Sequence, residues 1–274
     1  MSDKINLVGK IGSMALIREG ESDIDYNIFS RLGKELKPGM VWVSSGATEI
    51  GRLDYINRYG KELTGDEEEI KADYASQGQS ILMENYREFI SPKYSVRQLL
   101  VEHTHFNDDE KREHIRKFLH RCPKQNAVPI INYNDPVSYY ENRRREISLM
   151  KNKGAAPVEC VDNDETASVI CSLVNAPVLL ILTTVYGIYA TPGDKSTLIE
   201  EIVAKDKESL QEKVKQIQKA CIGASRKGAG GAFAKLEYVL NPAMNGTRVL
   251  IGSAKYNIND ILSGNAPCTR IEII

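Results

Sequence analysis

The sequence predicts an α/β protein with a mostly parallel sheet covered by helices on both faces. Short apolar runs alternate with longer amphipathic segments along all 274 residues, a pattern typical of parallel sheets with helical crossovers. The densest apolar run, 178–182, has the length of a strand rather than of a helix. Ligands of such sheets bind beyond the carboxyl ends of the strands, so the turns after the strands are where a site is expected.

The first half of the chain predicts alternating elements from its beginning. We expect strands at 5–8, 40–43, 96–101 and 128–131, and helices at 24–36 and 70–90. Another helix should follow residue 107, where Asn107 and Glu110 could cap its start reciprocally. The irregular segment 136–157 contains a run of three arginines and predicts a long loop or lid.

The second half continues the alternation. We expect a helix at 164–174, the strand at 178–182, a charged helix at 207–220, a helix carrying Lys235, and strands at 249–251 and 268–270. The sequence contains no internal repeat and no low-complexity linker, and its length suits one large domain over 1–274 or two small lobes.

Composition excludes several classes of partner. Lys plus Arg is 36 and Asp plus Glu is 37, so no basic excess exists to neutralise a nucleic-acid backbone. No stretch approaches the roughly 20 apolar residues of a membrane helix. The five cysteines are scattered, without a CxxC pair, which favours a reducing compartment. We therefore expect a cytoplasmic protein with neither nucleic acid nor a membrane as partner.

Two segments could hold phosphate. Gly228, Gly230 and Gly231 precede a helix and could present backbone N–H groups to phosphate oxygens, with Lys235 reaching over them; a flexible connector is an equal alternative. The segment from Lys10 through Gly12 to Ser13 offers a second anion site at the end of the first strand. Neither segment has the GxxxxGK[ST] spacing of a Walker loop.

For several polar segments, each taken alone, a structural role is a better explanation than a functional one. Asp162 with Glu165 resembles a helix-capping pair. Asn132, Asn134 and Asp135 follow a strand and could form a turn stabilised by side-chain-to-backbone hydrogen bonds.

Two further features admit a functional alternative. His103 and His105 alternate along what the pattern predicts as a strand end, so a zinc pair is conceivable, although no partner has ligand spacing nearby. The arginines 143–145 are more often a solvated charged run than an anion clamp.

A series of short motifs occurs in a fixed order, and together they are more specific than any one of them. In this order they resemble the amino acid kinase family, most closely the glutamate 5-kinases, over essentially the whole chain. The motifs are 10–13, 43–47, 77–79 ahead of 82–83, 129–135, 162–164, 182–189, 228–236 and the last strand at 268–270.

The resemblance implies a three-layer α/β/α sandwich, the amino acid kinase fold, that uses ATP and Mg²⁺. Residues 1–176 would form an acceptor-binding lobe and residues 177–274 a nucleotide-binding lobe. A homo-oligomer is expected on the same ground. The implied reaction is phosphorylation of a carboxylate, with glutamate, giving glutamate 5-phosphate in proline biosynthesis, as the leading acceptor.

The resemblance also assigns roles to residues, and it assigns no metal ligand. Lys10 and Lys235 match two lysines that offset charge on the transferring phosphoryl group, and Asp164 matches the acid that orients them. The acceptor-binding residues implied are Ser45, Gly46, Ala47, Asn134, Asp135, Asp162 and Asn163. The nucleotide-binding residues implied are Gly12, Ser13, Thr183, Thr184, Gly187, Tyr189, Gly228, Gly230 and Gly231.

Charge supports a zwitterionic acceptor. The carboxylates of Asp135 and Asp162 would repel a purely anionic substrate, whereas they could pair with the ammonium group of an amino acid. An acid acceptor needs no strong general base, because a glutamate side chain titrates near ~4.3 and is already ionised at neutral pH.

The sequence departs from the glutamate 5-kinase pattern at several places. Val161 replaces a glycine, Thr184 replaces an aspartate, and 191–194 replaces an aspartate-proline segment. The stretch between Asp135 and Asp162 is longer than usual and contains the three arginines. No C-terminal PUA domain is expected.

These departures keep two alternatives open. One is a kinase of the same fold acting on another small acid or on a phosphorylated acceptor held by the arginines. The other is a nucleotide-binding sensor or storage protein that has lost catalysis, as the changed nucleotide segment at Thr184 and Tyr186 suggests.

Overall fold

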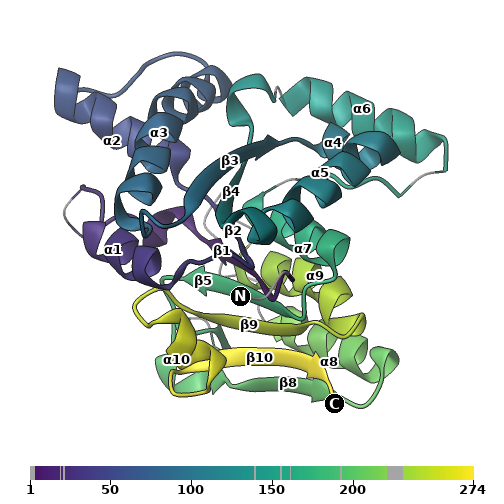
Figure 1. Cartoon of the computed structure of the whole chain (residues 1–274). Coiled ribbons are helices and arrows are strands. Elements are labelled where there is room, and N and C mark those ends of the chain that lie inside the picture. Colours follow the sequence, from purple (N-terminus) through teal and green to yellow (C-terminus); the bar gives the residue numbers. More distant parts are fainter. Residues whose placement is uncertain are drawn as a thin grey trace.

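A computed structural model describes residues 4–18, 20, 22–138, 140–154, 156–160, 162–191, 193–220 and 231–274. Within these residues the main sheet has eight strands, and its neighbouring strands are parallel except β9 and β10 (Figure 1). The strand order is β3 (Ser95–Val101), β4 (Ala127–Tyr133), β2 (Met40–Ser44), β1 (Leu7–Ile11), β5 (Val178–Thr183), β9 (Arg248–Ser253), β10 (Cys268–Ile273) and β8 (Glu201–Ala204). The predicted mostly parallel sheet is confirmed.

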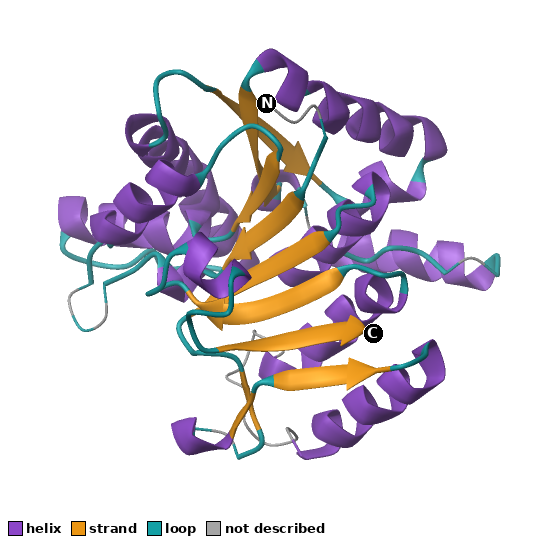
Figure 2. Cartoon of the chain, turned by 60° about the horizontal axis from the view of Figure 1, so that its bottom comes forward, coloured by secondary structure: helices purple, strands orange, loops and turns teal. Residues whose placement is uncertain are grey.

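Helices cover both faces of this sheet (Figure 2). Successive residues of a strand point to opposite faces, so that Val8 of β1 belongs to one hydrophobic cluster and Leu7 to the other. The Leu7 side is covered by α1 (Tyr26–Glu35), α2 (Ala47–Tyr59), α3 (Glu67–Phe89) and α10 (Ile258–Leu262). The Val8 side is covered by α4 (His103–Asn107), α5 (Asp109–Arg121), α7 (Asn163–Val174), α8 (Lys207–Ala220) and α9 (Gly231–Met244). The expected three-layer sandwich is therefore present.

The topology reverses beside β1. The chain passes from β1 to β2 on one side, and after α7 it returns to β5 on the other side of β1. In doubly wound sheets, ligands bind at such a reversal, beyond the carboxyl ends of the strands. The turns after β1, β2, β4 and β5 lie at this edge because the four strands are parallel.

The segment 136–157 does not form the long loop that we expected. It forms α6 (Tyr140–Asn152), which projects beyond the body of the molecule (Figure 1). Its sequence is rich in good helix formers and lacks glycine and proline, which explains why it is helical. Among its apolar side chains Ile147 is buried and Leu149 is exposed, so the apolar periodicity that marks a packed helix is nearly absent.

The start of the fifth helix also differs from the prediction. Asp108, rather than Asn107, caps α5 by accepting from the backbone N–H of Lys111 at 2.9 Å. The Asn107 amide instead bridges the carbonyls of His103 and Val158 at 2.9 and 2.8 Å. The expected reciprocal cap with Glu110 is therefore wrong.

Some short elements gave no clear signal in the sequence. These are β8, α4, α10, a hairpin of β6 (Ile188–Tyr189) and β7 (Leu198–Ile199), and the 3₁₀ turns Ser13–Ala15, Pro123–Gln125, Asp135–Val137 and Lys195–Thr197. The described helices include none that is both long and apolar enough to cross a bilayer.

A close helix contact supports the edge of the sheet where the strand-end turns gather. A Cβ atom on Gly51 of α2 would lie 1.9 Å from the carbonyl oxygen of Tyr74, and one on Gly78 of α3 would lie 1.8 Å from that of Ala47. Real Cβ atoms do not approach backbone so closely, so the two helices can touch only because both residues are glycine.

We predict that Gly78→Ala lowers the free energy of unfolding by about 1–3 kcal/mol, because the added methyl forces α2 and α3 apart. Urea denaturation followed by circular dichroism measures the change. The control is Ser76→Ala, an exposed position in the same helix, which should leave the denaturation midpoint nearly unchanged. Equal midpoints for Gly78→Ala and the control would contradict the packing argument.

Candidate active site

Two lysines and one aspartate meet in a largely buried cluster. Lys10, in β1, places Nζ 2.7 Å from Oδ1 of Asp164, and Lys235, in α9, places Nζ 2.8 Å from Oδ2 of the same carboxylate. The side chains of Lys10, Asp164 and Lys235 are 8%, 6% and 21% exposed. The structure thus brings together three residues far apart in the sequence, and Lys235 retains the largest exposed fraction.

The two ammonium groups determine the ionisation of Asp164. Burial alone would raise the pKa of this carboxyl, but the charges of Lys10 and Lys235 and their hydrogen bonds to it lower the pKa by more, so the net shift is downward. The aspartate is therefore ionised at neutral pH, and the cluster carries one net positive charge.

The start of α7 positions the acid. Asp162 is the N-cap residue, and its Oδ1 accepts from the backbone N–H groups of Asp164 and Glu165 at 2.7 and 3.0 Å. The capping interpretation of Asp162 is confirmed, while the Glu165 carboxylate accepts from the backbone N–H of Glu159 instead. Burial and the neighbouring Asp164 charge raise the pKa of Asp162.

The end of β2 leads into the positive end of a helix. Gly46 is the N-cap of α2 with φ +110°, a left-handed conformation that favours glycine, and no side chain caps the helix that begins at Ala47. A helix N-terminus without a side-chain cap can receive an anion. Ser45 is held just before it by a hydrogen bond from its backbone N–H to the carbonyl of Ile11 at 3.1 Å.

A buried chain of hydrogen bonds also fixes the Ser45 backbone. The indole N–H of Trp42 donates to the Tyr86 hydroxyl at 3.0 Å, Tyr86 donates to Ser44 Oγ at 2.8 Å, and Ser44 donates to the Ser45 carbonyl at 3.0 Å. Burial is the largest influence on Tyr86 and raises its pKa. The turn after β2 is therefore rigid.

A second polar cluster includes two residues that the sequence did not single out as site residues, Gln79 and Asn132. Asn163 Nδ2 donates to Ser45 Oγ at 3.2 Å and to Asn132 Oδ1 at 2.9 Å, and Asn132 Nδ2 donates to Gln79 Oε1 at 2.8 Å. The available signal was the occurrence of both residues inside motifs, at 77–79 and 129–135.

The other acceptor-side residues lie along the same edge. Asn134, next to Tyr133 at the end of β4, donates to Glu102 Oε1 at 3.3 Å. Asp135 Oδ1 lies 3.2 Å from Lys71 Nζ of α3, and this Asp is partly buried. Both side chains are thus held by protein partners.

Of the residues predicted to bind the nucleotide, several lie at the ends of β1 and β5. Gly12 donates its N–H to Leu182 O at 3.0 Å, Ser13 begins a 3₁₀ turn, and Thr183 Oγ1 accepts from the N–H of Val185 at 3.0 Å. Thr184 is exposed.

Two other nucleotide-side residues are tightly packed. A Cβ on Gly187 would lie 2.4 Å from Thr269 Oγ1, and the buried Tyr189 accepts from the N–H of Tyr186 at 3.1 Å. Gly231 begins α9, whereas Gly228, Gly230 and Val161 lie outside the described residues.

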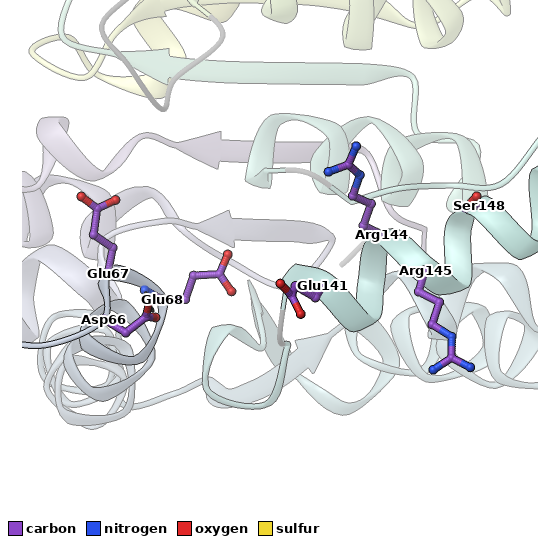
Figure 3. Close-up of a pocket in the computed structure, with 7 residues that line it drawn as sticks. All are labelled: Asp66, Glu67, Glu68, Glu141, Arg144, Arg145 and Ser148. Carbon is purple, nitrogen blue, oxygen red and sulfur yellow. Dashed lines mark hydrogen bonds between the residues drawn. The ribbon is translucent and has the colours of Figure 1, made fainter.

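The three arginines do not act as one group. Arg143 donates to the carbonyl of Cys160 at 3.3 Å, and its guanidinium carbon lies 5.7 Å from the centre of the Tyr133 ring. Arg144 and Arg145 instead line a cleft of about 700 Å³ between α6 and the acidic start of α3. Figure 3 shows these two side chains pointing away from each other, with Asp66, Glu67 and Glu68 on the opposite wall.

The histidine pair has a structural role. His103 and His105 lie in α4 rather than at a strand end: His103 Nε2 lies 2.8 Å from Glu146 Oε2 of α6, and His105 Nδ1 accepts from the backbone N–H of Glu102. No cluster of three potential ligands to a metal occurs within the described part of the chain. The expectation of a strand-end pair is therefore wrong, and the two rings face different partners.

Comparison with known proteins establishes the family. The sequence profile of the amino acid kinase family matches residues 7–253. The chain belongs to the amino acid kinase family. The resemblance noted in the motifs is thereby confirmed for the family as a whole.

Relatives with assigned names include glutamate 5-kinases. Glutamate 5-kinase 2 of Bacillus subtilis is 30% identical over 269 residues, which is 93% of this chain and 64% of that protein. Delta-1-pyrroline-5-carboxylate synthase B of Arabidopsis thaliana is 30% identical over 271 residues, 94% of this chain and 34% of that protein. The chain thus spans between about a third and two thirds of the length of these relatives.

Solved structures share the fold. Carbamate kinase from Giardia lamblia bound to AMP-PNP matches with a TM-score of 0.60 and 15% identity over the full length of both chains. UMP kinase from Ureaplasma parvum matches with a TM-score of 0.55 and 13% identity, over 98% of this chain and 99% of that one. These matches agree with the three-layer fold that the motifs implied for this chain.

We predict that Asp164→Asn destabilises the fold by about 3 kcal/mol or more at neutral pH, because it leaves two largely buried ammonium groups without their counter-charge. Urea denaturation measures the loss. Asp25→Asn is the control, since Asp25 caps α1 on the surface and asparagine caps a helix equally well. A loss no larger than that of the control would show that the ion pairs contribute nothing.

The difference in unfolding free energy between the wild type and Asp164→Asn should depend on pH. The folded-state pKa of Asp164 is lowered, so ionisation of this carboxyl stabilises the fold above its unfolded-state pKa, near ~3.9, and this contribution is lost as the pH falls through the folded-state pKa. The stability advantage of the wild type over Asp164→Asn should therefore be constant near neutral pH and shrink below about pH 4.

Proposed function

We propose that this family member transfers the γ-phosphoryl group of ATP to a carboxylate, with the γ-carboxylate of glutamate as the leading acceptor. The observation that carries the proposal is the cluster of two lysines on one buried aspartate, at the edge of the sheet where the strand order reverses. The named relatives at 27–30% identity, glutamate 5-kinases among them, support the same class of acceptor.

The cluster suits phosphoryl transfer because this reaction needs positioning and positive charge more than covalent chemistry. Lys10 and Lys235 come from elements on either side of the proposed division between an acceptor half, 1–176, and a nucleotide half, 177–274. Asp164 holds both ammonium groups in place without cancelling their combined charge. We propose that Lys10 and Lys235 contact oxygens of the transferring group as its charge is redistributed.

The acceptor would lie against the turn after β2. The uncapped start of α2 at Gly46 and Ala47 would receive one carboxylate of the amino acid. Its ammonium group would face Asp135 and the partly buried Asp162, which is the charge pattern of a zwitterion rather than of a simple diacid.

Mg²⁺ would accompany the nucleotide rather than occupy a cage of protein side chains. The Asp164 carboxylate is held by two lysines, and Asp162 uses Oδ1 to cap α7. This fits a cation that takes most of its ligands from phosphate oxygens and water, as Mg²⁺ commonly does. When bound, it would offset charge on the phosphate tail.

A second acceptor class is favoured by α6. Arg144 and Arg145 line the cleft between α6 and α3, and the described residues provide neither with an ion pair. An acid that carries a phosphate or a second carboxylate would have to bind these two arginines against the four acidic side chains that line the same cleft. Arg143 does not line this cleft, and one of its N–H groups donates to the Cys160 carbonyl.

We predict that Lys235→Ala lowers kcat by a factor of roughly 10²–10³, because one preorganised cation is lost from the transition state. ADP release measured with ATP and L-glutamate detects the change, and circular dichroism should show an intact fold. Lys215→Ala, on the exposed face of α8, is the matched control and should keep full activity. Unchanged turnover in Lys235→Ala would remove the assignment, and ATP binding without consumption across a panel of acids would favour a sensor.

A separate screen distinguishes the acceptor classes. We predict that Arg144→Ala with Arg145→Ala leaves kcat/KM for glutamate within about twofold, because neither arginine would be needed for a zwitterion. If the true acceptor is a phosphorylated acid, the same double variant should lose roughly tenfold or more in kcat/KM for it. Products trapped with hydroxylamine identify carboxyl rather than phosphate acceptors.

A further inference from the structure

A hydrogen-bond relay of fixed direction begins at the backbone of Tyr133. Its N–H lies 2.8 Å from Oδ1 of Asn132 and 3.3 Å from Oδ1 of Asn163. A backbone N–H can only donate, so both facing atoms must be carbonyl oxygens. This N–H therefore determines which atom of each amide faces Tyr133.

The two amide nitrogens then donate to defined partners. Nδ2 of Asn132 donates to Gln79 Oε1 at 2.8 Å, while Nδ2 of Asn163 donates to Ser45 Oγ at 3.2 Å and to Asn132 Oδ1 at 2.9 Å. Asn132 is 2% exposed, so water does not compete for its own amide group, while Asn163 and Ser45 are partly buried. The relay thus runs from α3 through β4 and α7 to the end of β2.

The relay leaves the O–H of Ser45 free to donate a hydrogen bond. Ser45 Oγ accepts from Asn163, and its own O–H makes no hydrogen bond to any residue that the structure describes. The backbone on both sides of this side chain is fixed by Ile11 and Ser44. The Ser45 O–H can therefore donate to a neighbouring acceptor, such as a carboxylate oxygen.

Gln79 accepts a hydrogen bond from Asn132 through Oε1, but its own NH₂ group lowers the stability of the fold. Its Nε2 is buried and has no hydrogen-bond partner among the described residues, and an unmade buried hydrogen bond is unfavourable. Packing alone would favour an apolar side chain of the same size, such as methionine. What glutamine supplies and methionine cannot is the acceptor for Asn132 Nδ2.

We propose that Gln79 and Asn132 are positioning residues that hold the Asn163 amide and the Ser45 hydroxyl as donors toward the carboxylate of the acceptor. Neither residue contacts the acceptor itself. The assignment rests on the proposed function, because it presumes that the acceptor lies beside Ser45.

A double-mutant cycle tests the relay. Gln79→Met should raise KM for L-glutamate about tenfold, the effect of a misdirected hydrogen bond to a charged group, and leave KM for ATP unchanged. In the Ser45→Ala background the same substitution should have a much smaller effect, because the hydroxyl it orients is gone. Equal effects in the two backgrounds, or a lowered melting temperature with both KM values unchanged, would overturn the proposal.

Two variants serve as matched comparisons. Gln79→Glu keeps an oxygen for Asn132 Nδ2 and should recover most of the affinity for glutamate that Gln79→Met loses. Ser76→Ala, one turn earlier on the exposed face of α3, should change neither KM. If Gln79→Glu is as impaired as Gln79→Met, the acceptor oxygen is not what matters at this position.

A measurement without turnover separates the relay from the reaction. Selective ¹⁵N labelling of asparagine gives NMR signals from the side-chain NH₂ groups of Asn132 and Asn163, and Gln79→Met should shift both and speed their exchange with water. A response confined to Asn132 would overturn the relay. If the wild type phosphorylates no carboxylic acid, the proposed function is wrong. The spectra would still show whether Gln79 orients the Asn163 amide.

Discussion

The site depends on one electrostatic constraint, the placement of two ammonium groups on a single carboxylate within the fold. Burying charge is costly, and the cost is offset here only because Asp164 accepts Lys10 on one oxygen and Lys235 on the other. The three residues lie in β1, α7 and α9, so the cluster also ties together both sides of the reversal in strand order. The arrangement leaves one net positive charge at the place where a phosphate tail could lie.

The acceptor side of the edge is built from neutral hydrogen bonds instead. Two relays converge on Ser45: the chain from Trp42 fixes its backbone carbonyl, and the Asn163 amide, which also donates to Asn132, donates to its hydroxyl oxygen. Each relay begins at a group that can only donate, an indole N–H or a backbone N–H, and so has one possible direction. The Ser45 hydroxyl is therefore a preorganised hydrogen-bond donor at this turn.

The sequence was sufficient where a signal is local or where motifs occur in order. Lys10, Asp164 and Lys235 were identified as partners because their motifs occur in an order that resembles a known family, and the alternating strands and helices predicted the layers. It was insufficient for α6, because this helix has few apolar residues and therefore lacks the apolar periodicity that predicts a packed helix. It was also insufficient for Gln79, because a glutamine in a long polar helix is expected to face solvent. Burial and the direction of a hydrogen bond are properties of the packed chain, and a single sequence does not contain them.

The central claim, that Lys10 and Lys235 converge on the phosphate tail of a bound nucleotide, can be tested directly with an acyl phosphate derivative of ATP, which acylates lysines near its terminal phosphate. Mass spectrometry of the labelled protein then maps the modified residues, with and without excess ATP. The account predicts labelling of Lys10 or Lys235 that ATP suppresses. Labelling confined to lysines remote from Asp164, or labelling of these two that ATP leaves unchanged, would contradict it.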